Sequence, residues 1–292
     1  MKLWLEQFCR DALTMAAVVL LLLVMPAVVG GAIEEPVRMY ASDTNASLFI
    51  VDFLTREAEW VGRTGQAFTD IAFNADGELY GINFFDLYKI DPQTAATSWI
   101  GTIGMPNGNW NSLVFDEGGT LWAAGSNAVI TIDTDTGVGT PFTTLAEGAA
   151  GDLAFDKDGN MYLTTSGGAL VRIDTEDGSV TEIGELPYTD IYGFGRGPDD
   201  RMYGIRRNNQ LLSIDLMTGA AEVLGGLSAN FAIGATNGGS FPTEAIPEPA
   251  TALLLSVVAL MAFQRRKRLA RTRTSHKSGK RDHTDRAQDQ PR

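Results

Sequence analysis

The chain of 292 residues has very little cysteine and histidine, two side chains on which much enzyme chemistry depends. Its only cysteine, Cys9, precedes an apolar segment near the N-terminus, and its two histidines, His276 and His283, lie near the C-terminus. The body between them therefore has no disulfide, thiol nucleophile, imidazole base or histidine metal ligand. These absences exclude histidine-dependent triads, histidine-bound zinc and most transition-metal sites there.

Basic residues are also scarce in the body. From Gln264 onward the chain has eleven Lys and Arg against three Asp and Glu, whereas residues 1–263 have twelve against thirty-three, a net charge of −21. A body with this negative charge repels phosphate backbones and anionic membranes. We therefore expect no nucleic-acid partner for the body. The basic tail follows an apolar stretch directly, which favours a charge cluster that sets membrane orientation over nucleic-acid binding.

The N-terminal segment has the order of a secretory signal peptide. Lys2 and Arg10 lie in a polar lead, residues 15–29 are apolar, and small residues follow up to Ala32. This order predicts a signal peptide over residues 1–32 with cleavage at Ala32, and an uncleaved membrane anchor is the alternative.

A second export element lies near the C-terminus. Residues 250–263 are uncharged, a run short of the about 20 residues that span a bilayer. The two prolines before this run exclude helix there, and a basic cluster follows it. The residues of this element are Pro247, Glu248 and Pro249, then Arg265, Arg266, Lys267 and Arg268.

The order over residues 247–268 resembles the PEP-CTERM sorting signal. The resemblance implies an exported protein of the cell envelope or extracellular matrix of a Gram-negative, exopolysaccharide-making bacterium. It also implies an exosortase-type membrane protease as partner and transient inner-membrane anchoring through a short C-terminal helix. This chain departs from the pattern by continuing over residues 269–292, a polar basic tail that we expect to be disordered.

Between the two export elements, the sequence repeats about every 41 residues. An aromatic residue recurs at intervals of 40, 42, 40 and 41, and an aspartate at 39, 42, 41 and 41. The aromatic series is Tyr40, Tyr80, Trp122, Tyr162 and Tyr203, and the aspartate series is Asp52, Asp91, Asp133, Asp174 and Asp215. Two independent markers that keep one period indicate a structural repeat.

Each repeat reads as four short strands, with alternating apolar residues and Asp-Gly or Thr-Gly pairs between them. This predicts an all-β fold, a five-bladed β-propeller over residues 38–239 followed by a linker at 240–246. The body opens without a first strand, and the segment from Phe231 matches one, so we expect the last segment to complete the first blade. Six blades with one degenerate copy are the alternative. The repeats resemble exported propellers of the NHL and YncE-like groups, which indicates architecture and not ligand.

Two repeated features carry weak chemical signals. Asp156, Asp158 and Asn160 alternate like calcium ligands, but the sister repeats do not keep these oxygens, which favours hairpin turns. The repeated aromatic could stack on sugars, yet its fixed place in a strand favours core packing.

The connections that differ from repeat to repeat are expected on one face of the ring, with the uniform Asp-Gly and Thr-Gly hairpins on the other. Variable loops on a rigid scaffold are typical of binding faces. The expected binding-face residues are Asn83, Phe84, Phe85, Asn107, Asn109, Trp110, Tyr188, Asp190, Arg206, Arg207 and Asn208.

No catalytic constellation, cofactor motif or metal site is evident. We therefore expect a non-enzymatic surface or matrix protein whose propeller binds exopolysaccharide or envelope proteins. The alternative is a hydrolase or lactonase-like propeller with a carboxylate-held divalent ion in the channel. That alternative needs acidic residues from three or more blades at the axis, and no repeat-aligned acidic residue is evident there.

Overall fold

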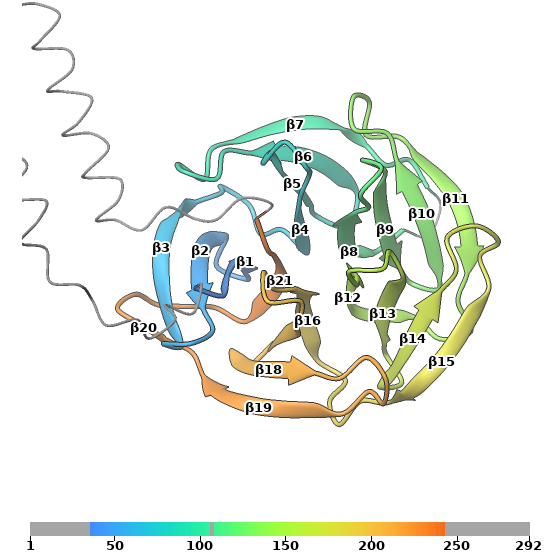
Figure 1. Ribbon diagram of the computed structural model, residues 1–292. Coiled ribbons are helices and arrows are strands. Elements are labelled where there is room, and N and C mark those ends of the chain that lie inside the picture. Colours follow the sequence, from blue (N-terminus) through green and yellow to red (C-terminus); the bar gives the residue numbers. More distant parts are fainter. Residues whose placement is uncertain (1–35, 106–107, 243–292) are drawn as a thin grey trace, which may run out of the picture. The chain divides into compact units, whose positions relative to one another are not determined.

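The structure is a computed structural model that describes residues 36–105 and 108–242, and these form strands and turns without a helix. The expected signal peptide, C-terminal helix and tail lie outside these residues. No helix within the described ranges is long and apolar enough to cross a membrane. The twenty-one strands form five sheets arranged as a ring, which confirms the five-bladed propeller (Figure 1).

Four blades each consist of four consecutive antiparallel strands, numbered from the axis outward. Blade 2 has β4 (Asp70–Phe73), β5 (Leu79–Ile82), β6 (Asp86–Ile90) and β7 (Thr97–Thr102). Blade 3 has β8 (Trp110–Phe115), β9 (Leu121–Gly125), β10 (Ala128–Ile132) and β11 (Gly139–Thr144). Blade 4 has β12 (Ala149–Phe155), β13 (Met161–Thr165), β14 (Ala169–Ile173) and β15 (Val180–Glu185). Blade 5 has β16 (Ile191–Arg196), β17 (Met202–Arg206), β18 (Gln210–Ile214) and β19 (Ala221–Gly226).

Blade 1 joins the two ends of the described chain. Its own strands are β1 (Arg38–Asp43), β2 (Ser47–Asp52) and β3 (Glu57–Arg63), and β21 (Thr236–Ser240) pairs antiparallel with β1 as the innermost strand. The last segment thus completes the first blade, as the repeat pattern predicts. An addition that the pattern did not predict is β20 (Ser228–Ala229), which pairs parallel with the outer edge of β3. The closing segment therefore holds blade 1 from both sides.

Asp43 fastens this closure. Its side chain is fully buried, and its Oδ2 accepts a hydrogen bond of 2.7 Å from the backbone N–H of Gly234, 191 residues further on. Its Oδ1 accepts the N–H groups of Asn45 and Ser47, each at 2.9 Å. One carboxyl group thus links the turn after β1 to the segment before β21.

The repeated aspartate of each unit shapes a turn. Asp91 Oδ1 accepts the N–H groups of Gln93 and Thr94, and the N–H of Ala95 donates to the Asp91 carbonyl. Asp133 makes the equivalent bonds to Asp135 and Thr136. Such side-chain bonds to the following amides define an Asx-turn, so the 41-residue marker is a local folding signal.

The repeated aromatics are buried between blades, at 5–8% exposure. Trp122 Nε1 donates to Asp116 Oδ2 at 2.8 Å, and the Tyr203 hydroxyl donates to Asp199 Oδ2 at the same distance. Core packing, rather than a ring of sugar platforms, is therefore the role of this series. The Asp156 oxygens accept hydrogen bonds within their own turn, as expected for a hairpin.

The strand directions give the ring two distinct faces. The loop face carries the connections between blades and those between each blade's second and third strands. The hairpin face carries the other connections within each blade. Inner strands run from the loop face to the hairpin face. β1 begins and β21 ends at the hairpin face, where Phe241 packs against Phe53 and Tyr203. Both ends of the described chain therefore leave from the face opposite the variable loops.

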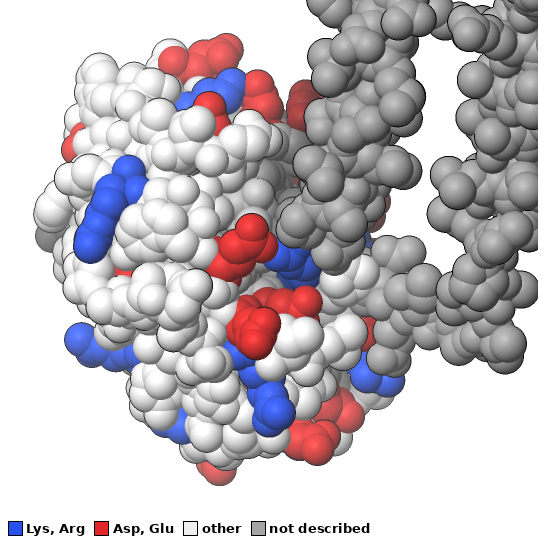
Figure 2. Space-filling view, turned by 90° about the vertical axis from the view of Figure 1, so that its left-hand side faces the viewer, with Lys and Arg blue, Asp and Glu red and all other residues white. Residues whose placement is uncertain are grey.

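Charged side chains are interspersed on the side of the ring around β3. Figure 2 shows basic and acidic groups alternating there with uncharged surface, rather than one patch of a single sign. Arg38 pairs with Glu59 at 2.5 Å within this blade. Such a surface offers no extended electrostatic footprint for a polyanion.

Removal of the Asp43 carboxyl should open the ring. Asp43→Ala leaves one buried and two partly buried N–H groups without this acceptor, and we expect a loss of about 3 kcal/mol in the free energy of unfolding. Urea unfolding of the full chain in mild detergent, followed by tryptophan fluorescence, measures it. Asp76→Ala, at an exposed hairpin tip, is the control and should change stability by less than about 0.5 kcal/mol. Equal effects of the two substitutions would contradict the role of Asp43.

Candidate functional site

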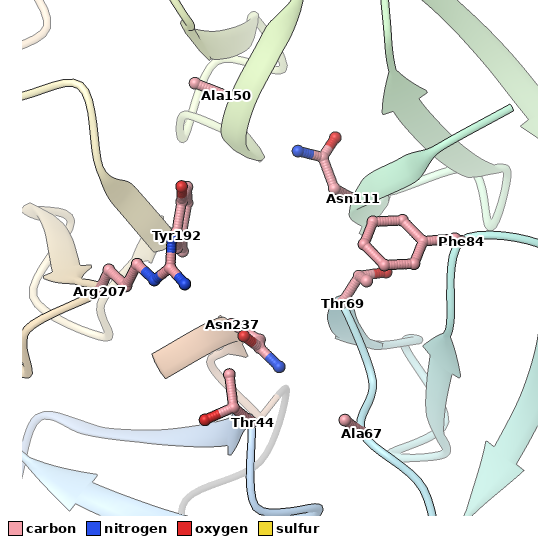
Figure 3. Close-up of a pocket in the computed structure, with 9 residues that line it drawn as sticks. All are labelled: Thr44, Ala67, Thr69, Phe84, Asn111, Ala150, Tyr192, Arg207 and Asn237. Atoms are coloured by element: carbon pink, nitrogen blue, oxygen red, sulfur yellow. The ribbon is translucent and has the colours of Figure 1, made fainter. Parts of the chain in front are cut away.

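A pocket of about 490 Å³ opens over the axis on the loop face. All five blades contribute to its wall, through the starts of inner strands, the connection before β4 and three connections between second and third strands. The lining residues are Thr44, Ala67, Thr69, Phe84, Asn111, Ala150, Tyr192, Arg207 and Asn237 (Figure 3).

The pocket wall is amphipathic. Figure 3 shows the Phe84 ring on one side and Tyr192 with Arg207 on the opposite side. Amide and hydroxyl groups complete the wall, and Arg207 is the one charged side chain among the nine lining residues. An aromatic face with several neutral hydrogen-bonding groups is a mixture suited to a small polar ligand with an apolar face.

Phe84 reaches the pocket through a strained backbone. Its φ is 75°, in the left-handed region that bulky side chains rarely adopt, and its side chain is 43% exposed. Neighbouring bonds hold this conformation: the Trp110 N–H donates to the Phe84 carbonyl at 3.3 Å, and the Ile103 N–H to the Phe85 carbonyl at 2.8 Å. Strain of this kind at a pocket wall is typical of ligand sites.

Arg207 is positioned by its neighbour. Arg206 donates to both Asp190 oxygens, at 2.7 and 3.2 Å, and its guanidinium lies 3.9 Å from the Tyr188 ring centroid. The Arg207 N–H donates to the Asp190 carbonyl at 2.9 Å. The Asp190 carboxylate is thus occupied by Arg206, while the Arg207 side chain lines the pocket.

The floor of the pocket ties adjacent blades together. Thr69 Oγ1 donates to the Trp110 carbonyl at 2.7 Å, and Asn237 Nδ2 donates to the Phe68 carbonyl at 3.0 Å. The Asn111 Nδ2 lies 3.4 Å from the Ala149 carbonyl. Residues of the pocket wall therefore also fix the spacing of the inner strands.

Immediately below this layer, two buried carboxyl groups meet. Asp70 of blade 2 and Asp152 of blade 4 are fully buried and hydrogen-bond each other, and because these blades are not neighbours the pair spans the axis. Burial raises the pKa of both groups well above the usual range, and the charge of Asp70 raises that of Asp152 further. The raised pKa values favour a proton shared between the two carboxyls.

Backbone amides occupy the oxygens of this pair. Asp70 accepts the N–H groups of Ile71 and Leu113, at 2.7 and 2.5 Å. Asp152 accepts those of Leu153 and Phe194, at 2.7 and 2.8 Å. Such saturated oxygens are poor ligands for a divalent ion, which takes six to eight oxygens. No group of three acidic, histidine or cysteine side chains suited to a metal occurs in the described ranges.

The pair also corrects an expectation from the sequence. Asp70 and Asp152 occupy the same place in their repeats and do face the axis, where the sequence analysis found no repeat-aligned acid. The equivalent residues of the other three blades are Ser112, Gly193 and Gly238. We call these five positions the axial column, and its side chains differ from blade to blade. A Cβ at Gly238 would collide with the Asp70 carboxyl, which explains the glycine there.

The predicted binding-face residues lie in different environments. Phe84 and Arg207 line the pocket. Phe85, Asn109 and Asn208 are exposed, Asn83 shapes its own turn, and Asn107 lies outside the described residues. Tyr188, Asp190 and Arg206 form the positioning cluster for Arg207. Trp110 is a correction: it is 3% exposed and packs in the core, because it begins an inner strand.

Seven lining residues were not predicted from the sequence, and four of them share one position in their repeats. Thr69, Asn111, Tyr192 and Asn237 each directly precede the axial column of Asp70, Ser112, Gly193 and Gly238. The residue type directly before the axial column varies between repeats, whereas apolar residues around it recur. This variation is the signal in the sequence that could have identified the four pocket residues.

The fold, the repeats and the export elements together define an exported repeat propeller of the cell envelope. Residues 32–197, more than half of the chain, match the family described as "Repeat of unknown function (DUF6923)", and the chain belongs to this family. Residues 245–268 match the PEP-CTERM protein-sorting motif, as the Pro-Glu-Pro sequence and the basic cluster predict.

Solved structures share the fold at low identity. One, described as "The de novo evolutionary emergence of a symmetrical protein is shaped by folding constraints", aligns with a TM-score of 0.50 and 16% identity, covering 73% of this chain and 100% of that chain. Virginiamycin B lyase from Staphylococcus aureus aligns with a TM-score of 0.43 and 16% identity, covering 65% and 69%. Similarity at this level concerns the fold alone. No curated protein matches the chain.

The axial pair should make stability depend on pH. Its folded pKa values lie above the about 3.9 of an unfolded aspartate, so the folded protein holds a proton that the unfolded chain releases. The stability from this pair is complete below about pH 4 and falls as pH rises towards the raised pKa values. We expect Asp152→Asn to reduce this fall, measured as urea midpoints from pH 4 to 8.

Asp133→Asn provides a control of opposite sign. Hydrogen bonds from Thr136 lower the pKa of Asp133, so its stabilising effect is present above about pH 4 and is lost as pH falls. Parallel pH profiles for wild type and Asp152→Asn would contradict the shared proton.

Proposed function

We propose that this exported propeller is a non-catalytic binding module that holds a glycan of the cell envelope or its matrix in the loop-face pocket. The observation that carries the proposal is the strained Phe84 ring facing amide and hydroxyl groups from other blades. The apolar face of a sugar ring stacks on an aromatic side chain, and its hydroxyls exchange hydrogen bonds with amides and hydroxyls.

The position of the chain ends supports this proposal. The described chain begins and ends at the hairpin face, so neither of its ends lies at the loop face.

We further propose that an exosortase-type membrane protease processes the PEP-CTERM segment, and that the mature protein resides at the outer surface or in the exopolysaccharide matrix of a Gram-negative bacterium. The support is the match over residues 245–268 together with the predicted signal peptide. Export through both elements delivers the pocket to the compartment that contains the glycan.

The hydrolase alternative has less support. Its essential feature is a cluster of available carboxylates at the axis, whereas the Asp70 and Asp152 oxygens accept backbone N–H groups beneath the pocket. We therefore propose binding without turnover.

Replacement of Phe84 by glycine separates binding from folding. Glycine adopts the φ of 75° without strain, which relieves about 1–2 kcal/mol of backbone strain. This gain offsets the greater conformational entropy of glycine in the unfolded chain, so the free energy of unfolding should stay within about 1 kcal/mol of wild type. Loss of the ring should weaken glycan binding about tenfold, or about 1.4 kcal/mol. Binding of the full chain in detergent to an array of bacterial exopolysaccharides and oligosaccharides measures it.

Trp99→Ala is the matched control, because Trp99 is 60% exposed on β7 and does not line the pocket. It should bind the array as wild type does. Unchanged binding by Phe84→Gly, or no array ligand for the wild type, would refute the proposed site.

The sorting segment is tested in an exosortase-containing host. We expect the intact mass of the mature wild-type protein to lack residues 1–32 and the residues after the Pro-Glu-Pro sequence. The double substitution Pro247→Ala and Pro249→Ala should preserve N-terminal cleavage and retain the C-terminal segment. Identical C-terminal masses for the two proteins would contradict processing at this motif.

A further inference from the structure

We propose that the pocket selects an acidic sugar, a hexuronate unit whose carboxylate faces Arg207 and whose apolar ring face lies on Phe84. The inference rests on the proposed glycan-binding function and names the class of glycan.

The Arg207 guanidinium is available for a ligand anion. The ion pairs of the described part of the chain do not include it, whereas its neighbour Arg206 holds Asp190 in a bidentate pair and donates to Gln210 at 2.8 Å. Arg207 is exposed, and its side chain lines the pocket. The protein thus supplies a counter-ion for one of two adjacent arginines, and the other extends into the pocket.

The charge carried by the residues that line the pocket is opposite in sign to the net charge of the protein. Residues 1–263 have a net charge of −21, yet no carboxylate belongs to the nine lining residues. Asp43, Asp70 and Asp152 are buried beneath this wall, where their oxygens accept backbone N–H groups. Because a planar guanidinium forms bidentate bonds with a carboxylate, the ligand charge that fits Arg207 is a single carboxylate.

The rest of the wall fits the rest of a sugar acid. Phe84 lies across the pocket from Arg207 and offers a ring for the apolar face (Figure 3). Asn111, Tyr192 and Asn237 supply neutral amide and hydroxyl groups to the wall for the hydroxyls of the sugar. One cation with neutral amides and hydroxyls therefore fits a hexuronate better than a phosphate, which typically gathers several cationic or backbone donors.

The test compares uronate trisaccharides with their methyl esters, which keep the shape and lose the charge. The probes are trigalacturonate, triglucuronate and trimannuronate, each titrated calorimetrically into the full chain in detergent. We expect at least one acid to bind tenfold or more tightly than its ester, with an advantage that decreases as salt rises. Arg207→Gln should abolish that advantage, so that each acid and its ester bind the variant with affinities equal within twofold.

Arg201→Gln is the matched control, because Arg201 is exposed on the hairpin face. It should preserve the preference for the acid. Equal binding of acids and esters, or a preference for the acid that survives Arg207→Gln, would overturn the inference. The proposed glycan binding would still stand in that case if neutral glycans of the array bind. No binding to any glycan would refute the proposed function, and the inference with it.

Discussion

The pairing of β21 with β1 is the constraint on which the rest of the structure depends. Tyr40 pairs with Ser240 and Ala41 with Gly239, so a segment almost 200 residues downstream becomes the innermost strand of the first blade. The same strand supplies Asn237 to the pocket wall and Gly238 to the space beside Asp70. Ring closure and the candidate site are therefore one structural feature, because an open ring would lack part of both.

The axial carboxyl pair adds a polar layer to this closed ring. Asp70 binds an amide of β8 and Asp152 binds an amide of β16, so each acid sets the register of its own blade against the next. Burial of two acids costs solvation, and a shared proton reduces that cost. We interpret the pair as a device that selects one arrangement of the five inner strands, at the level directly beneath the pocket.

The sequence predicts the fold well because its strongest signals are local. Asp91 and Asp133 shape turns within six residues of themselves, and the buried aromatics recur once per blade, so their period reports the architecture directly. The pocket could not be predicted in the same way, since it brings together residues from 44 to 237 that become neighbours only when the ring closes. Phe84 and Arg207 were found through loop variation, whereas Trp110 belongs to the core and the axial acids are hidden in a column that changes from Asp to Ser to Gly.

Hydrogen–deuterium exchange of the full chain tests the closed ring most directly. The backbone amides of β1 and β21 should exchange only through global unfolding, with the same free energy as those of the inner strands β4 and β8. The denaturant dependence of exchange should also be the same for these four strands. Exchange of the β21 amides at a much lower free energy than those of β4 and β8 would show that the last segment opens independently, and the closed ring with its shared pocket would be contradicted.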